Sequence, residues 1–431
     1  MKNQAENLAL GKSTGNMPHP NFRDDLVPAD EALAMVLSNA VPTATETLAL
    51  KDASNRILAK DLISRRTQPP FDASAMDGYA ARATDLASTP VTLKVIGESA
   101  AGHPFNGSVS AGETVRTFTG AIIPDGADTI IIQENTTTEP GKVTVLTGAP
   151  EGKFIRRAGL DFTTGDRLLN KGDVLDAPRL SLAASMNYPN VNVYRKPLVA
   201  LLTTGDELVL PGNELKPGQI IASNVFGLIA LVHENGGEVL DLGIVTDTME
   251  ALQTAIDTAL SKGADIIVTT GGASVGDHDL VKPAMENAGF QFEFHKLAMR
   301  PGKPLLFAKR KSDGHTCRLV GLAGNPVSSL VAGPVFLRPL IRSLAGFPLD
   351  TIEPISAMLG TELPENDERM EFMRATAKVN DDGTIIATPF SKQDSSMLAN
   401  LAAANCLLIR PIRAKSAKPG DSCQIVPLRA F

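Results

Sequence analysis

The sequence predicts a multidomain α/β protein, and three observations lead to this class. The chain has 431 residues, more than one typical domain holds. Strand-like and helix-like segments alternate from residue 196 to 346, and short β-rich runs lie on either side of that region. The alternation predicts a doubly wound sheet of parallel strands, with ligands beyond the carboxyl ends of the strands.

Composition excludes several other classes of protein. With 43% hydrophobic and 21% charged residues, the chain can bury cores and is not disordered over most of its length. A net charge of -7 argues against non-specific nucleic-acid binding. Residues 1–21 are polar and no apolar run reaches about 18 residues, so we expect a cytoplasmic protein with no membrane segment. The three cysteines and six histidines are dispersed, which favours neither a disulfide framework nor a His-ligated metal.

The pattern divides the chain into five segments. A flexible tail (1–21) precedes a discontinuous N-terminal linking domain (22–66 and 160–195), an inserted β-rich domain (67–159), the αβ domain (196–346) and a C-terminal β domain (347–431). An amphipathic helix begins near Pro28, and a second helical segment over 178–186 is expected to pack on it.

The finer pattern places individual strands and helices. In the inserted domain we expect strands over 91–96, 114–118, 129–133 and 142–146. In the αβ domain we expect strands over 198–203, 239–244 and 265–270 with helices over 225–233 and 248–262, and in the last domain strands over 370–377, 384–388, 406–409 and 424–426.

Three expected strand ends in the αβ domain carry glycine together with acids or hydroxyls, at 203–207, 271–279 and 321–329. Glycine lets a backbone approach a ligand, and Asn325 followed by Pro326 has the pattern of an N-cap and first residue of an anion-facing helix. Three ordinary tight turns are the alternative. No G-x-G-x-x-G follows the first strand, which points to a phosphorylated ligand other than NAD.

Basic side chains crowd between the second and third loops. Lys296, Arg300 and Lys303 lie within eight positions, and the Pro301-Gly302 turn can direct the last two toward one cleft. Such a cluster beside acidic loops suits an oxyanion or phosphate together with a divalent ion, and a solvated surface patch is the alternative. Far upstream, residues 70–80 mix aromatic, hydroxyl and carboxylate side chains without a clear period, as functional loops often do.

Together these segments resemble the molybdopterin molybdenumtransferase family, which includes the bacterial MoeA proteins and the gephyrin E domain. The matching motifs are F-D-A-S-A-M-D-G-Y at 71–79, T-G-A at 119–121, T-G-D-E-L at 204–208, G-G-A-S-V-G at 271–276, P-G-K-P at 301–304 and G-N-P at 324–326. They follow one another in the family's order from about residue 25 to the C-terminus.

The resemblance implies a homodimer of four-part subunits whose αβ domain is of the molybdopterin-binding type. It implies that adenylylated molybdopterin and molybdate are the substrates, that Mg²⁺ is the cofactor, and that molybdenum cofactor and AMP are released. The family's cleft lies between the αβ domain of one subunit and the inserted β-rich domain of its partner. A contact with the molybdopterin adenylyltransferase that supplies the substrate is a further implication.

The family's functional positions transfer to this sequence through the motifs. The implied catalytic residues are Asp77, Thr119, Asp161, Glu207, Asp247 and Asp279, of which Glu207 and Asp279 would hold the metal. The implied substrate-binding residues are Ser274, Lys296, Arg300, Lys303, Asn325, Pro326, Arg374 and Ser395.

The sequence departs from the family pattern at three positions. Arg300 replaces a usual lysine and offers a planar fork instead of a point charge. Ala323 replaces a usual proline, which relaxes the loop before Asn325. Asp394 replaces a usual glycine, and its carboxylate would repel molybdate unless it is turned away. Two other functions stay open at this point, a molybdopterin adenylyltransferase and a non-catalytic, gephyrin-like scaffold dimer.

Overall fold

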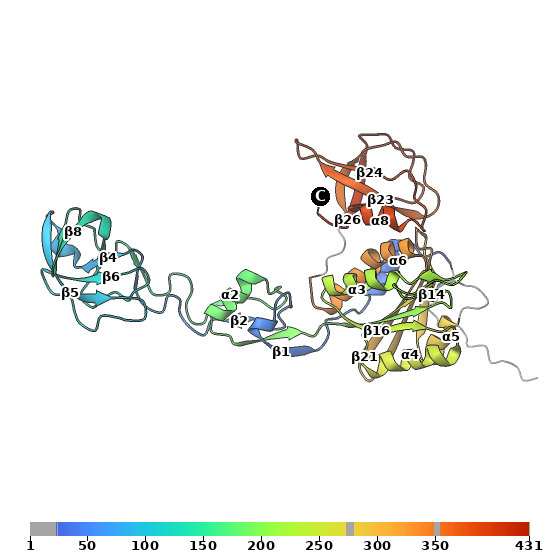
Figure 1. The fold of residues 1–431 in the computed structure, drawn as a ribbon, viewed down its shortest axis with the longest axis horizontal. Helices are drawn as coiled ribbons and strands as arrows, with labels where there is room; N and C mark the ends of the chain where they lie inside the picture. Colours follow the sequence, from blue (N-terminus) through green and yellow to red (C-terminus); the bar gives the residue numbers. More distant parts are fainter. Residues whose placement is uncertain (1–22, 24, 273–279, 349–353, 431) are drawn as a thin grey trace, which may run out of the picture. The chain divides into compact units, whose positions relative to one another are not determined.

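The computed structural model describes residues 23, 25–272, 280–348 and 354–430. These residues form two compact units, one of residues 47–193 and the other of the described residues before 47 and after 193 (Figure 1).

The β-rich part of the 47–193 unit is built on a six-stranded sheet. Its order is β7 (Thr129–Ile132), β4 (Gly78–Ala81), β6 (Glu113–Thr117), β5 (Val91–Ser99), β9 (Lys142–Val145) and β8 (Thr136–Glu139). Four of these strands fall on runs that the sequence predicts. The other two, β8 and β4, do not. Strand β4 begins in the 70–80 segment and pairs with β6 on one side and β7 on the other.

The remainder of this unit is a small mixed domain. It contains β1 (Thr45–Ala49), β2 (Leu62–Ile63), β3 (Ala73–Ser74), β10 (Ile155–Arg156), β11 (Arg167–Leu169), α2 (Ala177–Ser185) and β12 (Asn190–Tyr194). Helix α2 begins after Asp176, whose carboxylate accepts a hydrogen bond from the backbone N–H of Arg179. Its core includes Leu58, Leu175 and Met186, all fully buried.

The αβ domain of the second unit contains a mixed six-stranded sheet. Its order is β16 (Glu238–Val245), β13 (Leu198–Thr204), β17 (Ile266–Thr270), β21 (His315–Leu322), β20 (Pro304–Ser312) and β18 (Gln291–Lys296). The first four strands are parallel as predicted, but β20 and β18 pair antiparallel. The carboxyl ends of β13, β17 and β21 lie side by side, because Thr203 pairs with Thr270 and Thr270 with Leu322.

Helices cover both faces of this sheet (Figure 1). One face packs against α1 (Ala29–Leu37), α3 (Asn224–Glu234), α6 (Pro326–Ala332), the π-helical turn η4 (Gly333–Leu337) and α7 (Arg338–Leu344), and the other against α4 (Met249–Ser261) and α5 (Val281–Asn287). The prediction that the first helix packs on the 178–186 helix is wrong. Helix α1 buries Ala32 and Val36 in the core of the αβ domain, where it contacts α7.

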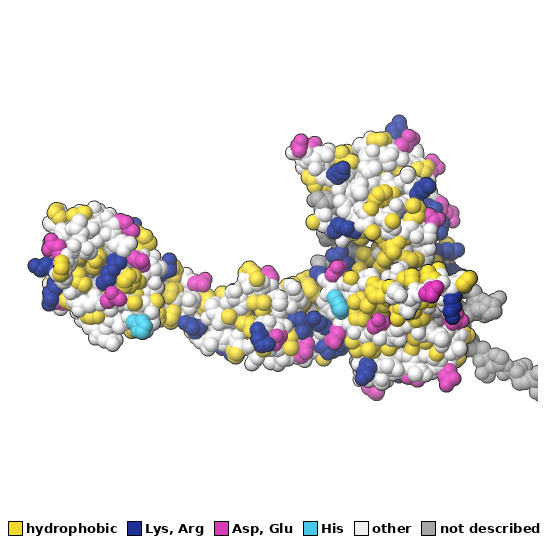
Figure 2. All heavy atoms as spheres, viewed as in Figure 1, with side chains coloured by type: hydrophobic (Ala, Val, Ile, Leu, Met, Phe, Trp, Pro, Cys, Tyr) yellow, Lys and Arg dark blue, Asp and Glu magenta, His cyan; other side chains and the backbone are white. Residues whose placement is uncertain are grey.

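The outer side of α3 leaves hydrophobic side chains at the surface (Figure 2). Phe226 on α3 is 52% exposed and Ile220 in β15 (Ile220–Ile221) is 54% exposed. Among the described residues, the continuous helical stretch Pro326–Leu344 is long and apolar enough to cross a membrane, but 78% of it is buried inside the protein. It packs in the core of the αβ domain.

The C-terminal domain is a closed β-structure. Its strand order is β23 (Met370–Val379), β24 (Ile385–Pro389), β22 (Ile355–Leu359), β26 (Ser422–Pro427) and β25 (Cys406–Arg410), and β25 pairs back to β23. Helix α8 (Leu398–Ala403) lies before β25. Strand β19 (Met299–Arg300) of the αβ domain pairs in parallel with β23, so the two domains share main-chain hydrogen bonds.

Candidate active site

A cavity of about 340 Å³ lies at the carboxyl end of β13, β17 and β21, where the sequence predicts ligand-binding loops. Predicted site residues Glu207, Asn325 and Pro326 line it. The other lining residues are Thr203, Thr204, Leu208, Ile220, Ile221, Ala222, Ser223, Asn224, Val225, Thr270, Gly271, Gly324 and Ser396. The cavity therefore combines apolar walls with hydroxyl, amide and carboxylate groups, as ligand sites usually do.

Glycine is required where the loops after β13 and β17 approach each other. Gly271 has a φ of +92°, and a Cβ added there would lie 2.3 Å from the carbonyl oxygen of Thr204. Any other residue would push the two strand ends apart. Gly271 thus keeps this part of the cavity narrow.

The loop after β21 begins a helix as the sequence predicts. Asn325 is the N-cap of α6, and its Oδ1 accepts hydrogen bonds from the backbone N–H groups of Val327 (3.1 Å) and Ser328 (3.5 Å). Pro326 is the first helical residue. Asn224, which the sequence analysis missed, donates from Nδ2 to the Gly324 carbonyl at 2.7 Å and so holds this loop from the start of α3.

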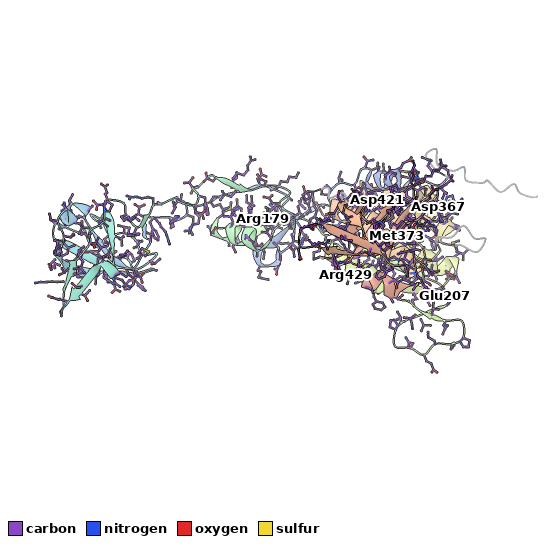
Figure 3. The ribbon with its side chains drawn as sticks, turned by 90° about the horizontal axis from the view of Figure 1, so that it is seen from above. Arg179, Glu207, Asp367, Met373, Asp421 and Arg429 are labelled. Atoms are coloured by element: carbon purple, nitrogen blue, oxygen red, sulfur yellow. The ribbon has the colours of Figure 1, made fainter. Side chains whose placement is uncertain are left out.

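Two predicted acids follow neighbouring strands. Glu207 precedes β14 (Leu208–Val209), near the base of the projecting β14–β15 connection (Figure 3), and its carboxylate lies against Gly205. Asp247 follows β16 and accepts a hydrogen bond from the Thr204 hydroxyl. Predicted residues Ser274 and Asp279 lie outside the described residues.

The three predicted cations are on the 296–303 segment, and none of them is among the described residues that line the cavity. Arg300 turns toward the C-terminal domain, with Nε 3.2 Å from Glu371 Oε1 and a second guanidinium nitrogen 3.4 Å from Asp367 Oδ2. The Lys303 side chain is exposed, and its carbonyl accepts a hydrogen bond from Leu297 N. Arg300 therefore joins two domains, while Lys303 is available to solvent.

The C-terminal domain supplies a loop over 393–396. Arg374, only 1% exposed, has its backbone N–H bonded to the Gln393 side chain at 2.9 Å, and one guanidinium nitrogen donates to the Asp394 carbonyl at 2.9 Å. Its Nε is buried without a hydrogen-bond partner, and burial lowers the pKa of Arg374. Ser396 lines the cavity, whereas the predicted Ser395 is not among its lining residues.

The Asp394 carboxylate is exposed and accepts hydrogen bonds from its own loop. Its Oδ1 accepts hydrogen bonds from the Ser396 hydroxyl at 2.6 Å and the Ser396 N–H at 2.8 Å. These bonds, with the positive charge of Arg374, lower the pKa of Asp394. A carboxylate two residues before a serine is the sequence signal that predicts such a turn.

The 47–193 unit holds a second group of predicted residues. Asp77 Oδ1 accepts hydrogen bonds from the Thr119 N–H (2.8 Å) and hydroxyl (2.9 Å), and these bonds with the charge of Arg116 lower the pKa of Asp77. Asp161 is exposed, and its N–H donates to the Gln68 carbonyl. Gly78 permits the close pairing of β4 with β7, since a Cβ there would lie 1.9 Å from the Ile131 carbonyl oxygen.

Arg116 is a residue of this group that the sequence analysis missed. Its guanidinium carbon lies 5.0 Å from the ring centre of Tyr79 and 4.9 Å from that of Phe118. Its nitrogens donate to the Gly78 carbonyl at 3.2 Å and to Gln133 Oε1 at 2.8 Å. These contacts fix a positive charge behind Asp77.

The donor chemistry at the cavity suits a hard cation such as Mg²⁺. Among the residues that the structure describes, no three Asp, Glu, His or Cys side chains gather into a metal-binding set. Mg²⁺ commonly takes only one or two protein carboxylates and completes its shell with water and substrate phosphate. Glu207, whose carboxylate is among the groups that line the cavity, fits that requirement.

Comparison with known proteins covers nearly all of the chain. Residues 27–187 match the model of the "MoeA N-terminal region (domain I and II)", residues 200–343 a "Probable molybdopterin binding domain", and residues 356–428 the "MoeA C-terminal region (domain IV)". A molybdopterin molybdenumtransferase of Haemophilus influenzae is 37% identical over 92% of this chain and 98% of its own length. One of Bacillus subtilis is 33% identical over 94% of each chain.

Solved structures give the same result. A molybdopterin biosynthesis MoeA protein from Pyrococcus horikosii has a TM-score of 0.78 and 31% identity, covering 94% of this chain and 100% of that one. The fold and the cavity at the strand ends define a multidomain transferase of molybdenum cofactor biosynthesis. The chain belongs to the MoeA family.

Proposed function

We propose that this MoeA-family molybdopterin molybdenumtransferase inserts molybdate into adenylylated molybdopterin in the presence of Mg²⁺, releasing molybdenum cofactor and AMP. The observation that carries the proposal is one cavity at the carboxyl end of the αβ sheet that brings together Glu207, Asn325 and Pro326 from separate loops. A phosphorylated heterocycle is the kind of ligand that this edge of an α/β sheet binds.

Glu207 and Asp279 are the proposed Mg²⁺ ligands. Bound there, Mg²⁺ would neutralise phosphate charge as the phosphoanhydride is cleaved. Glu207 lines the cavity together with Asn325 and Pro326, the cap and first residue of α6. Asp247 holds the Thr204 hydroxyl, so we propose that it acts by fixing this hydroxyl toward substrate.

The proposed oxyanion ligands are cations and hydroxyl groups that are not among the described residues lining that cavity. Lys303 and Lys296 supply charge from the 296–303 segment, and Ser274 supplies a hydroxyl. Arg374 brings a buried Nε without a hydrogen-bond partner, and its guanidinium donates to the carbonyl of Asp394, the residue before Ser395. Arg300 already contacts Glu371 and Asp367, so we propose that it contributes mainly by holding β19 against β23.

The 47–193 unit contributes Asp77, Thr119 and Asp161 to the same reaction. Asp77 carries a carboxylate whose negative charge is stabilised by Thr119 and Arg116. We propose that this carboxylate orients substrate through hydrogen bonds while Thr119 fixes its rotamer.

A homodimer is the proposed assembly, in the cytoplasm. Exposed Leu210, Leu215, Ile220 and Phe226 on the β14–β15 connection and α3 form the kind of apolar surface that a second copy covers. Transfer of adenylylated molybdopterin from a molybdopterin adenylyltransferase is the proposed source of substrate.

The test is AMP release from adenylylated molybdopterin. We expect release that depends on molybdate and is abolished by chelation of Mg²⁺, and we expect Asp279→Ala to lose it. Release that is unchanged without molybdate would refute the proposal. Formation of adenylylated molybdopterin from ATP and molybdopterin would instead identify an adenylyltransferase.

A further inference from the structure

Two hydroxyl groups of the cavity have their protons committed within the protein. The Ser396 hydroxyl lies 2.6 Å from Asp394 Oδ1, and a second bond of 2.8 Å joins the same oxygen to the Ser396 N–H. An ionised carboxylate has no proton to give, so the hydroxyl must be the donor. The lowered pKa of Asp394 keeps this carboxylate ionised at neutral pH. Ser396 can therefore offer a ligand only its lone pairs.

Two further lining residues, Thr204 and Glu207, have the same polarity. The Thr204 hydroxyl donates to the Asp247 carboxylate, and Thr204 also lines the cavity. Glu207 adds a carboxylate, which accepts hydrogen bonds when it is ionised. These three groups present hydrogen-bond acceptors to whatever enters.

Charge and shape narrow the choice of ligand. None of the described residues that line the cavity is lysine or arginine. Leu208, Ile220, Ile221 and Val225 supply apolar wall. Acceptor groups repel a free oxyanion such as molybdate, which has only acceptors of its own, but they match the N–H and amino groups of a flat nitrogen heterocycle.

We propose that this cavity holds the amino-substituted heterocycle of the substrate, and that Ser396, oriented by Asp394, is a specificity-determining residue that accepts a hydrogen bond from it. The inference rests on the proposed function, because that function names the two heterocycles available, the pterin and the adenine of adenylylated molybdopterin. It also gives the unusual Asp394 a role, which is to fix the direction of the Ser396 hydroxyl.

The experiment measures binding in the absence of molybdate, so it does not depend on turnover. The full-length protein is titrated with adenylylated molybdopterin and, separately, with AMP. We expect Ser396→Ala to weaken binding of adenylylated molybdopterin about 3–10-fold, the usual worth of one hydrogen bond. If Ser396→Ala weakens AMP binding equally, the adenine is the group that donates to Ser396. If AMP affinity is unchanged, the pterin is that group.

Two variants of Asp394 test whether it acts by orienting the Ser396 hydroxyl or only by stabilising the loop. The amide oxygen of Asp394→Asn can still accept the Ser396 proton, so this variant should bind like wild type. Asp394→Ala frees the hydroxyl to rotate and should lose affinity as Ser396→Ala does. The thermal midpoint should stay the same in Ser396→Ala.

Two results would overturn the inference. One is unchanged affinity of Ser396→Ala for adenylylated molybdopterin. The other is a rise in the KM for molybdate alone, which would make Ser396 an oxyanion ligand. The proposed function fails by a different measurement, namely if the wild-type protein shows no molybdate-dependent release of AMP.

Discussion

Asp77 and Thr119 are 42 positions apart, yet one oxygen of the Asp77 carboxylate accepts both the N–H and the hydroxyl of Thr119, at 2.8 and 2.9 Å. The pair joins the start of β4 to the end of β6, two neighbouring strands of one sheet. It fixes the direction of an exposed carboxylate that would otherwise rotate freely.

Removal of the Thr119 hydroxyl should reduce activity. Thr119→Val keeps the backbone bond but loses the second one, and we expect kcat/KM for adenylylated molybdopterin to fall about 3–10-fold. Thr119→Ser keeps both donors and should retain wild-type kinetics. Equal kinetics for all three proteins would show that the orientation of Asp77 is unimportant.

The same pair predicts a pH effect. The Thr119 bonds and the charge of Arg116 lower the pKa of Asp77, so its ionised form persists to lower pH and is lost only as the pH falls through the folded-state pKa. Thr119→Val removes part of that stabilisation and raises the pKa of Asp77. The acid limb of the kcat/KM profile should therefore move to higher pH than in wild type or Thr119→Ser, and an unmoved limb would contradict the assignment.

The hydrogen bond from Asn224 to the loop before α6 should stabilise the fold. It is 8% exposed, and its Nδ2 holds the Gly324 carbonyl immediately before the cap of α6. Asn224→Ala leaves that carbonyl unsatisfied, and urea unfolding should show a loss of about 1–3 kcal/mol. Asn224→Asp, which has the same size but no N–H donor, should lose at least as much. Wild-type stability of Asn224→Asp would rule out this hydrogen bond as the cause.

A salt bridge at the amino ends of the αβ strands, away from the cavity, should affect stability alone. Both terminal nitrogens of Arg195 lie 2.9 Å from the carboxylate of Asp265, which is buried just before β17 and raises the pKa of Arg195. Since Arg195 itself is partly exposed, we expect Arg195→Met to lower the free energy of unfolding by about 1–2 kcal/mol. Activity of the folded variant should be that of wild type. A changed KM would show that this salt bridge affects substrate binding at the carboxyl ends of the strands.

Lys303 tests the separate oxyanion site. We expect Lys303→Ala to raise the KM for molybdate more than the KM for adenylylated molybdopterin, because it removes a solvent-accessible positive charge. Lys311→Ala, which removes an exposed lysine on β20, is the matched control. Equal increases in both KM values would refute a separate oxyanion site.

Much of the αβ domain could be predicted from the sequence, because its strands and helices have clear periodicity and its loops carry glycine and a capping Asn-Pro pair. Strand β4 could not be predicted. Gly78 and Ala80 have low strand propensity, and pairing with β6 and β7 on both sides determines this strand. The periodicity of α1 identifies its buried face but not the element it packs against, which is α7 instead of α2.

The residues that line the cavity could likewise be predicted only in part from the sequence. Asn325 and Pro326 are recognisable because a cap is a local pattern. Asn224 and Ser396 are recognisable only in the fold, since one is bonded to a carbonyl 100 residues away and the other reaches the cavity from a different domain. The mixed character of the sheet is likewise set by the β20–β21 hairpin, which a strand–helix alternation does not reveal.

The most direct test of the account is the molar ratio of molybdenum bound in the pterin product to AMP released, measured in one reaction of the full-length protein with adenylylated molybdopterin, molybdate and Mg²⁺. The account predicts equal amounts at every time point. AMP release without molybdenum in the product would contradict it and would identify a hydrolase of adenylylated molybdopterin.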